Sequence, residues 1–373
     1  MSPFEPERLD DAAFLTEADP AGMLPAVASS GAQVRASHRG AQEAGVSRLS
    51  AGDRPRAIVI AGVGGSAIAG DMLAAVCGGG VPIPILTVRS YRLPGWVGAA
   101  DLVIAVSASG TTEETRTLAL EAVRRGCRLI TVGRAGSPLA AIAEQASALH
   151  LPVVPVQGAV RLPRANLWGL TMPLIAIASA LGLAEVDADA VEATAKRLED
   201  IAHRCRPSSE SFINPGKTLA LEMADSIPMV WGSSPVATAA AHRLATQLNE
   251  NAKYPALWGE IPEVDHNQVV ALDGPLAQRD IFGDEPSLAL RLIVLRDLEE
   301  HPQVSKRRAM SVRLAQDRGV PVSEITAEGE HPLERLASLV GLVDYGSVYL
   351  ALGLGVDPTP VSAISELKAR LSQ

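Results

Sequence analysis

Two loops rich in glycine and hydroxyl residues carry the side chains best suited to bind a small anion. The apolar run Leu102–Val106 leads into Ser107-Ala-Ser-Gly-Thr-Thr112, and a helix is predicted to start at Glu113. The first N–H groups of a helix lack partners within it, and they lie at the positive end of its dipole. Hydroxyls beside such a helix start, with Gly110 allowing close backbone approach, favour a phosphate ligand. An ordinary Ser/Thr helix cap is the alternative for this turn taken alone.

A second loop of this kind lies upstream. The apolar run Ala57–Ile60 is followed by Ala61-Gly-Val-Gly-Gly-Ser66 and a helical pattern. Gly62-x-Gly64-x-x-Ala67 also fits the dinucleotide fingerprint, which needs an acid after the next strand to bind the ribose. The strand predicted there, Ile83–Val88, is followed by Arg89 and no acid. An NADP-dependent reductase stays an alternative, but two hydroxyl-bearing loops fit a sugar phosphate better.

Residues suited to proton transfer occur in the second half of the chain. Glu250 lies in the last turn of a helix predicted over 235–251. The negative end of a helix dipole disfavours a carboxylate, so helix stability gives no reason for an acid there, and a general base is favoured. His266 lies beside Asp265, and a neighbouring acid can orient an imidazole. A surface carboxylate and an ordinary loop histidine are the alternatives for each residue taken alone.

The elements that position these residues alternate between strand and helix, which predicts two α/β domains with parallel, doubly wound sheets. We predict an N-terminal domain over 1–165 with the phosphate loops, a helical connector over 166–210, and a C-terminal domain over 211–373 with Glu250 and His266. Trp231-Gly-Ser-Ser234 is a weak echo of the first hydroxyl loop. Strands are predicted at 57–60, 83–88, 102–106, 128–132, 149–154, 228–232, 268–272, 290–295 and 322–325, and helices at 19–45, 67–76, 113–125, 138–146, 166–205, 217–223, 235–251, 305–318, 332–354 and 362–371.

Composition disfavours several classes of partner. The 373 residues carry a net charge of −9 without a long Lys/Arg run, so nucleic acid and anionic membranes are poor partners. HxH, HExxH and Cys/His clusters do not occur, so no metal is expected. Cys77, Cys127 and Cys205 lack CxxC spacing and cannot all pair, which indicates a reducing compartment.

The chain is expected in the cytoplasm. The N-terminal residues do not show the basic start and apolar core of a signal peptide. Leu167–Ala184 is uncharged and just long enough to span a membrane. Gly169, Pro173 and Gly182 interrupt it, so a buried helix is predicted.

Four segments together resemble the bifunctional phosphoglucose/phosphomannose isomerases of the sugar-isomerase (SIS) domain superfamily. They are GVGGSAIAGD, SASGTTEET, RLPRANLWG, and LNENAKYPALWGE with the later DHN, and the likeness covers roughly residues 20–370. The resemblance implies two SIS domains, a homodimer with shared active sites and a hexose 6-phosphate substrate. It also implies that no metal or nucleotide cofactor takes part.

The resemblance assigns roles by position. Arg164 would stabilise the negative charge of an enediolate, and Glu250 would move a proton between C1 and C2. His266, contributed by the partner subunit, would open the sugar ring, and Lys368 would close over the substrate. The phosphate would be bound by Gly65, Ser66, Ser107, Ser109 and Thr112.

The chain departs from the family pattern at two positions. Thr111 stands where asparagine is usual, and Arg134 lies in a loop that is usually of Ser-Gly-Gly type. Thr359 aligns loosely with a threonine associated with mannose substrates. The expected function is interconversion of glucose 6-phosphate, mannose 6-phosphate or both with fructose 6-phosphate, and the preference between the two is left open. The alternative is a non-catalytic SIS regulator that binds a phosphosugar.

Overall fold

The computed structural model describes residues 4–156, 158–160, 162–277 and 288–371, which form two compact units. The five-strand unit consists of Ala28–Glu199 and Gly329–Ala337. The four-strand unit consists of the described residues of Met1–Val27, Asp200–Glu328 and Ser338–Gln373. Residues before Ala28 thus group with the C-terminal half, whereas the predicted domains are continuous ranges divided at 165 and 210.

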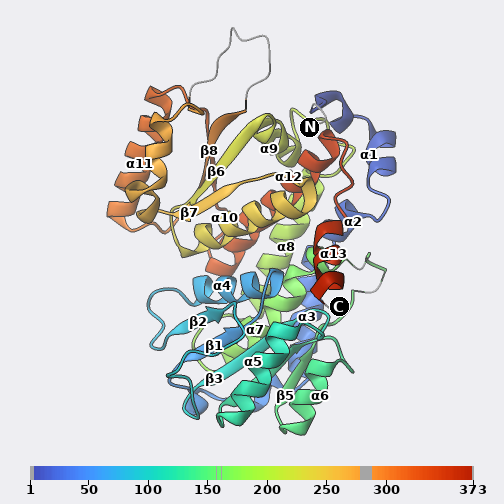
Figure 1. The fold of residues 1–373 in the computed structure, drawn as a ribbon, viewed down its shortest axis with the longest axis vertical. Coiled ribbons are helices and arrows are strands. Elements are labelled where there is room, and N and C mark those ends of the chain that lie inside the picture. The colour runs from blue at the N-terminus through green and yellow to red at the C-terminus, as the bar shows by residue number, and fades with distance from the viewer. Residues whose placement is uncertain (1–3, 157, 161, 278–287, 372–373) are drawn as a thin grey trace. The chain divides into compact units, whose positions relative to one another are not determined.

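The described strands of the five-strand unit form one parallel sheet in the order β2-β1-β3-β4-β5 (Figure 1). Every strand predicted in this half of the chain is present, within a few residues of its predicted ends. They are β1 (Ile58–Ala61), β2 (Ile85–Val88), β3 (Leu102–Ser107), β4 (Arg128–Gly133) and β5 (Leu149–Pro152).

Helices cover both faces of this sheet, as predicted for a doubly wound fold. Val59 and Ala61 pack in one core with residues of α5 and α6. Side chains alternate along a strand, so Ile60 points to the opposite face, where it lies against Gly70 of α4. The helices are α3 (Ser30–Glu43), α4 (Gly65–Cys77), α5 (Glu113–Arg124), α6 (Pro138–Gln145), α7 (Leu167–Ala180) and most of α8 (Ala188–Arg204).

The apolar segment flagged in the sequence is a buried helix, as predicted: α7 is buried from Leu167 to Ala178. Within the described residues, one helix, α12 (Pro332–Gly353), is long and apolar enough to cross a membrane. Its apolar window is 94% buried in the protein. Core helices pass the same length and composition test, so the finding is weak evidence for a span.

The described strands of the four-strand unit are also parallel, in the order β7-β6-β8-β9. Met229 and Trp231 of the central strand pack with Leu292 of its neighbour and with Val312 and Ala315 of α11. The strands are β6 (Ser226–Gly232), β7 (Leu257–Glu260), β8 (Ala289–Arg296) and β9 (Val322–Thr326). The helices are α1 (Ala12–Ala18), α2 (Met23–Ala28), α9 (Pro215–Met223), α10 (Pro235–Gln247), α11 (Pro302–Asp317), α13 (Ser362–Leu371) and most of α12.

The strand predicted at 268–272 is wrong, because Gln268–Asp273 forms a 3₁₀ turn. Its β-branched residues suggested a strand, but only Leu272 of the turn is buried. Trp231 Nε1 donates a hydrogen bond to Gln268 Oε1 at 2.8 Å, which holds the turn beside β6. The position next to β6 in the sheet is taken by β7, which the sequence pattern did not reveal.

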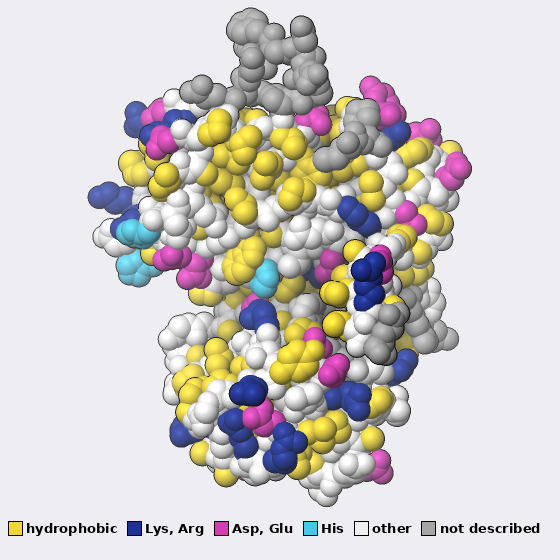
Figure 2. Space-filling model, viewed as in Figure 1, with side chains coloured by type: hydrophobic (Ala, Val, Ile, Leu, Met, Phe, Trp, Pro, Cys, Tyr) yellow, Lys and Arg dark blue, Asp and Glu magenta, His cyan; other side chains and the backbone are white. Residues whose placement is uncertain are grey.

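Charged side chains are mixed on the face of the molecule shown in Figure 2. Described basic and acidic side chains both occur on this face, and apolar side chains gather over its upper part.

The three cysteines are free, and we predict that they react slowly in the folded protein. Burial raises the pKa of Cys77 to about 11 and that of Cys205 to about 12, and burial also raises the pKa of Cys127. The thiolate is the reactive form, so little of it exists at pH 7.5. A colorimetric thiol reagent should label all three rapidly in denaturant and slowly in buffer. Rapid labelling of the native protein would contradict these environments.

Candidate active site

The two predicted phosphate loops lie at the carboxyl ends of neighbouring strands. The glycine loop follows β1 and the hydroxyl loop follows β3, and these strands are adjacent in the sheet although β2 lies between them in sequence. The order of strands reverses at this point, and ligands of doubly wound sheets bind outside such a switch point. A Cβ atom on Gly62 would lie 3.2 Å from the Val106 carbonyl oxygen, so the glycine loop packs directly against the end of β3.

The hydroxyls of the second loop are arranged by hydrogen bonds within the turn. Ser107 Oγ lies 2.9 Å from Thr112 Oγ1 and accepts a hydrogen bond from Gly110 N–H at 3.0 Å. Ser109 Oγ lies 2.8 Å from Thr111 Oγ1, so the threonine that replaces the usual asparagine orients the Ser109 hydroxyl. Ser107 is buried and Ser109 is exposed. The turn therefore fixes the Ser107–Thr112 pair and leaves Ser109 exposed.

Both helix starts at this edge of the sheet leave backbone donors without a side-chain cap. Neither Gly64, the N-cap of α4, nor Thr112, the N-cap of α5, makes a side-chain cap hydrogen bond. Among described residues the Ser66 hydroxyl also makes no hydrogen bond, although this residue is buried. Unpaired N–H groups at helix N-termini and hydroxyls are the donors that an anion requires. The arrangement supports the predicted roles of Gly65 and Ser66.

Gly110 offers a direct test of the hydroxyl loop. Its φ is +69°, and a Cβ atom there would lie 2.0 Å from Ser137 Oγ. Gly110→Ala should therefore distort the turn, lower the free energy of unfolding by about 1–3 kcal/mol, and raise KM for a sugar phosphate roughly tenfold, a binding loss of about 1.4 kcal/mol. Gly126→Ala is the matched control, because φ there is +70° but no atom lies within 4 Å of the added Cβ. An equal KM in the two variants would show that the turn does not bind substrate.

Arg164 lies on the 3₁₀ turn Pro163–Ala165, which Gln33 of α3 holds in place. Gln33 is buried, and its Nε2 donates to the Ala165 carbonyl oxygen at 3.0 Å. A cavity of about 540 Å³ is lined by Ser109, Arg134 and residues next to Arg164. The five-strand unit thus brings the hydroxyl loop, Arg134 and the Arg164 turn to one cavity. No sequence motif pointed to Gln33, because its role depends on a contact across 132 residues.

Glu250 lies half-buried in a π-helical turn, Leu248–Ala252, that continues α10. The sequence predicted one regular helix to Asn251, but α10 ends at Gln247. In the π turn the Leu248 carbonyl oxygen accepts hydrogen bonds from the N–H groups of Lys253 and Tyr254. Such wide turns are frequent at functional sites. The local geometry therefore adds to the case for Glu250.

His266 is exposed at the end of the 3₁₀ turn Glu263–His266. Asp265, expected to orient its imidazole, accepts a hydrogen bond from Ser311 of α11 at 2.7 Å and lies 3.6 Å from Arg307. Among described residues His266 makes no hydrogen bond or ion pair. The expectation that Asp265 orients His266 is wrong, because the carboxylate is held on the side of α11.

The other predicted site residues of the four-strand unit lie on its C-terminal segment. Lys368 is exposed on α13. Thr359 is half-buried, and its N–H donates to Asp357 Oδ1 at 2.8 Å. Lys253 Nζ donates to the Asp357 carbonyl oxygen at 3.0 Å, so the segment that carries Thr359 lies beside the Glu250 turn. In the part of the chain that the structure describes, no group of three or more His, Cys, Asp or Glu residues could hold a metal ion.

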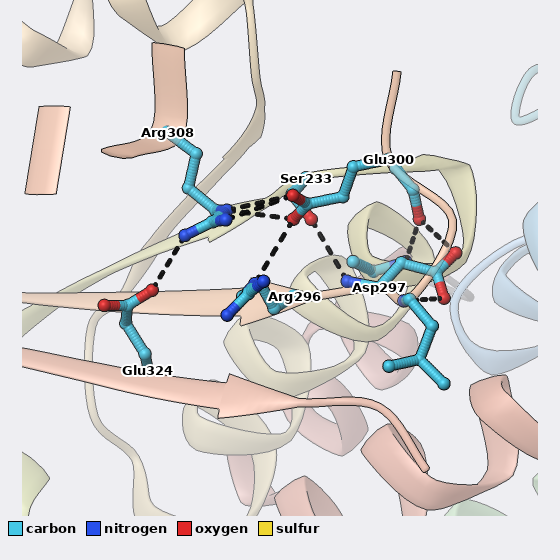
Figure 3. Close-up of polar contacts among 9 residues, drawn as sticks. Ser233, Arg296, Asp297, Glu300, Arg308 and Glu324 are labelled. Carbon is cyan, nitrogen blue, oxygen red and sulfur yellow. Dashed lines mark hydrogen bonds and ion pairs between the residues drawn. The ribbon is translucent and has the colours of Figure 1, made fainter. Parts of the chain in front are cut away.

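The four-strand unit has its own switch point between β6 and β8, where the Ser233–Ser234 echo lies (Figure 3). Ser234 Oγ donates to Asp297 Oδ2 at 2.9 Å, and Asp297 N–H donates to Ser233 Oγ at 3.1 Å. Arg308 binds half-buried Glu300 through Nε at 2.9 Å and Nη2 at 3.1 Å. Burial acts to raise the pKa of Glu300, but hydrogen bonds from Ser233 and Arg308 outweigh it, and the pKa is lowered. At this switch point, Asp297 and Glu300 of the chain itself therefore supply the negative charges that a bound anion would supply.

Comparison with known proteins identifies first the class of protein. Residues 212–371 match the family model described as the bacterial phospho-glucose isomerase C-terminal SIS domain. A glucose-6-phosphate isomerase from Chlamydia trachomatis has the same fold, with a TM-score of 0.72 over 99% of this chain and 84% of that chain at 13% identity. A hypothetical protein from Thermus thermophilus gives a TM-score of 0.69 over 98% of this chain and 94% of that chain at 15% identity. The fold is therefore that of a two-domain sugar isomerase.

Sequence relatives then narrow the class to a family. A bifunctional phosphoglucose/phosphomannose isomerase from Caldicellulosiruptor bescii is 34% identical over 85% of this chain and 89% of its own length. A protein of the same name from Aquifex aeolicus is 29% identical over 85% of this chain and 91% of its own. The chain belongs to the bifunctional phosphoglucose/phosphomannose isomerase family, which confirms the resemblance seen in its motifs.

Proposed function

We propose that this chain interconverts glucose 6-phosphate, mannose 6-phosphate or both with fructose 6-phosphate. The observation that carries the proposal is family membership at 34% identity over 85% of the chain. Glu250, His266 and Arg164 are the residues to which the family resemblance assigns this chemistry, and all three are present. A non-catalytic phosphosugar regulator would have no use for this set, so the enzyme is the better interpretation.

The phosphate is bound at the switch point of the five-strand unit. The Ser107–Thr112 pair fixes the turn, Ser109 and Ser66 donate hydroxyl hydrogen bonds, and the uncapped start of α4 adds the N–H of Gly65. A phosphate held there fixes one end of the sugar. Binding energy at this remote group can then position C1 and C2 for reaction.

The proton transfer is assigned to Glu250. Its carboxylate removes the C2 proton of the open-chain aldose; the C2–H electron pair forms the C1–C2 double bond, and the π pair of the C1 carbonyl moves onto O1 to give the enediolate. The 2-hydroxyl proton then passes to O1, the C2–O bond becomes the carbonyl as the double bond opens, and C1 takes the proton back from Glu250. Arg164 stabilises the charge that develops on the oxygens. Because C2 loses its stereocentre in the enediolate, both aldose epimers can connect to fructose 6-phosphate.

Ring opening is assigned to His266, which we place in the site of a partner subunit in a homodimer. The exposed imidazole, without a hydrogen-bond partner among the described residues of its own chain, supports this placement. The loops of the five-strand unit and the acid and imidazole of the four-strand unit then act on one hexose. The three free cysteines favour a reducing compartment, the cytoplasm.

A coupled assay with both aldose phosphates tests the proposal. Fructose 6-phosphate should form from at least one of them, and the rate should be unchanged after incubation with EDTA, because no step is assigned to a metal. A purified, folded chain that binds the sugars but forms no product would support the regulator instead. A loss of rate with EDTA, restored by a divalent cation, would overturn the metal-free mechanism.

A further inference from the structure

The π turn that carries Glu250 is bound from outside by one ammonium group. The last carbonyl groups of a helix have no N–H partners within it. Lys253 Nζ donates to two of them, the carbonyl oxygens of Glu250 at 3.0 Å and Asn251 at 3.1 Å. The residue that supplies this group stands directly after the turn, in the left-handed region with φ of 55°. A cation at a helix C-terminus also interacts favourably with the dipole.

The same ammonium group holds a second segment. Lys253 Nζ donates to the carbonyl oxygens of Asp357 at 3.0 Å and Pro358 at 3.5 Å, more than 100 residues along the chain. The three N–H donors of the Lys253 ammonium group are thus shared between carbonyl oxygens of the π turn and those of the segment that leads to α13. The ammonium group fixes the distance between them.

The buried side of the turn is anchored independently. Asn251 is buried, and its Nδ2 donates to Ser347 Oγ of α12 at 2.9 Å. Ser347 Oγ donates to the Asp344 carbonyl oxygen at 2.8 Å, and the Asp344 carboxylate forms a buried pair with Arg243 of α10 at 2.7 Å. Glu250 thus directly precedes a residue anchored in the core, Asn251, and its own carbonyl oxygen is bound by a residue at the surface, Lys253.

We propose that Lys253 is a positioning residue for the base Glu250. The inference rests on the proposed isomerase function. A π turn contains one residue more than an α-helical turn, so its conversion to α-helix would rotate the residues after the turn by about 100° around the helix axis relative to α10, and Glu250 within the turn by part of that angle. The ammonium group opposes that conversion, because it binds carbonyl oxygens as the π geometry presents them. Asn251 supplies the matching anchor from the core.

The test compares Lys253→Met with wild type, Lys253→Arg and the control Lys306→Met, which removes an exposed lysine of the same unit. We expect Lys253→Met to lower kcat about 10²-fold and to leave KM for glucose 6-phosphate nearly unchanged. The primary isotope effect with substrate deuterated at C2 should rise, since a displaced base slows proton abstraction relative to other steps. Lys253→Arg should recover part of kcat, and Lys306→Met should resemble wild type.

The isotope effect separates positioning from a loss of folded protein. A smaller folded fraction lowers the rate but leaves the isotope effect of the remaining enzyme unchanged, and that result would overturn the inference. A kcat of Lys253→Met equal to that of the wild type would also overturn the inference. The proposed function would still be supported in that case, as long as the wild-type enzyme forms product. If Lys253→Met yields little folded protein, Lys253→Gln replaces it, with the same expected fall in kcat and rise in isotope effect. Failure of wild type itself to form product would reject the proposed function.

Discussion

Glu250→Gln should bind fructose 6-phosphate nearly as well as wild type and isomerise it roughly 10⁴-fold more slowly, at the upper end of what a general base contributes. The amide keeps the size of the carboxylate and the backbone contacts of the π turn, but it cannot accept a proton. Calorimetric titration measures binding, and the coupled assay measures turnover. An unchanged KM or Kd with a lost kcat identifies an interaction made only during proton transfer.

Glu222→Gln is the matched control for this variant. Glu222 is half-buried in the last turn of α9, so it shares burial, position in a helix and unit with Glu250. It should keep wild-type turnover. Turnover in Glu250→Gln within a few fold of the control would refute its role as base. Loss of sugar binding in that variant would indicate a binding role instead.

His266→Ala should slow the cyclic hexose phosphates about 10²-fold and slow an open-chain aldose phosphate much less. Erythrose 4-phosphate is a suitable open-chain probe, because the hydroxyl that would close its ring is phosphorylated. The ratio of the two kcat/KM values is the measured quantity. His203→Ala, which removes another exposed histidine of the same unit, should leave the ratio unchanged.

Equal slowing of cyclic and open-chain substrates would contradict a ring-opening role. Mixing the inactive Glu250→Gln and His266→Ala proteins then tests where His266 acts. If the imidazole serves the partner subunit, mixed dimers contain one site with both wild-type residues, and activity returns. No recovery, despite verified subunit exchange, would place His266 in the site of its own chain.

The alternation of apolar strands and helices was enough to predict two parallel sheets, because most strands of these sheets are short runs of largely buried residues. The strand predicted at 268–272 is wrong, although it rests on the same apolar pattern as the strands that the structure confirms. Its residues have the composition of a strand, but the bond from Trp231 to Gln268 and the unexpected β7 decide its structure. Local composition cannot show which segment a sheet edge will accept.

The phosphate loops were predictable because their chemistry is local: a strand, a glycine, hydroxyls and a helix start occur within one segment. The residues that position Arg164, His266 and Glu250 were not predictable in this way. Gln33 reaches the Arg164 turn from another helix, and Asp265 turns to α11 instead of its neighbour His266. The π turn at Glu250 depends on Lys253 and a buried anchor in α12. Except for the bonds from Lys253 to its own turn, these contacts join residues far apart in sequence, and no motif encodes them.

The most direct measurement is an experimental structure of the protein with fructose 6-phosphate bound. The account predicts the phosphate on the hydroxyls of Ser66 and Ser109 and the N–H of Gly65, with a Glu250 carboxylate oxygen about 3 Å from C1 or C2 and a His266 imidazole near the ring oxygen. A phosphate bound at these hydroxyls with Glu250 out of reach of both carbons, in every subunit, would contradict it.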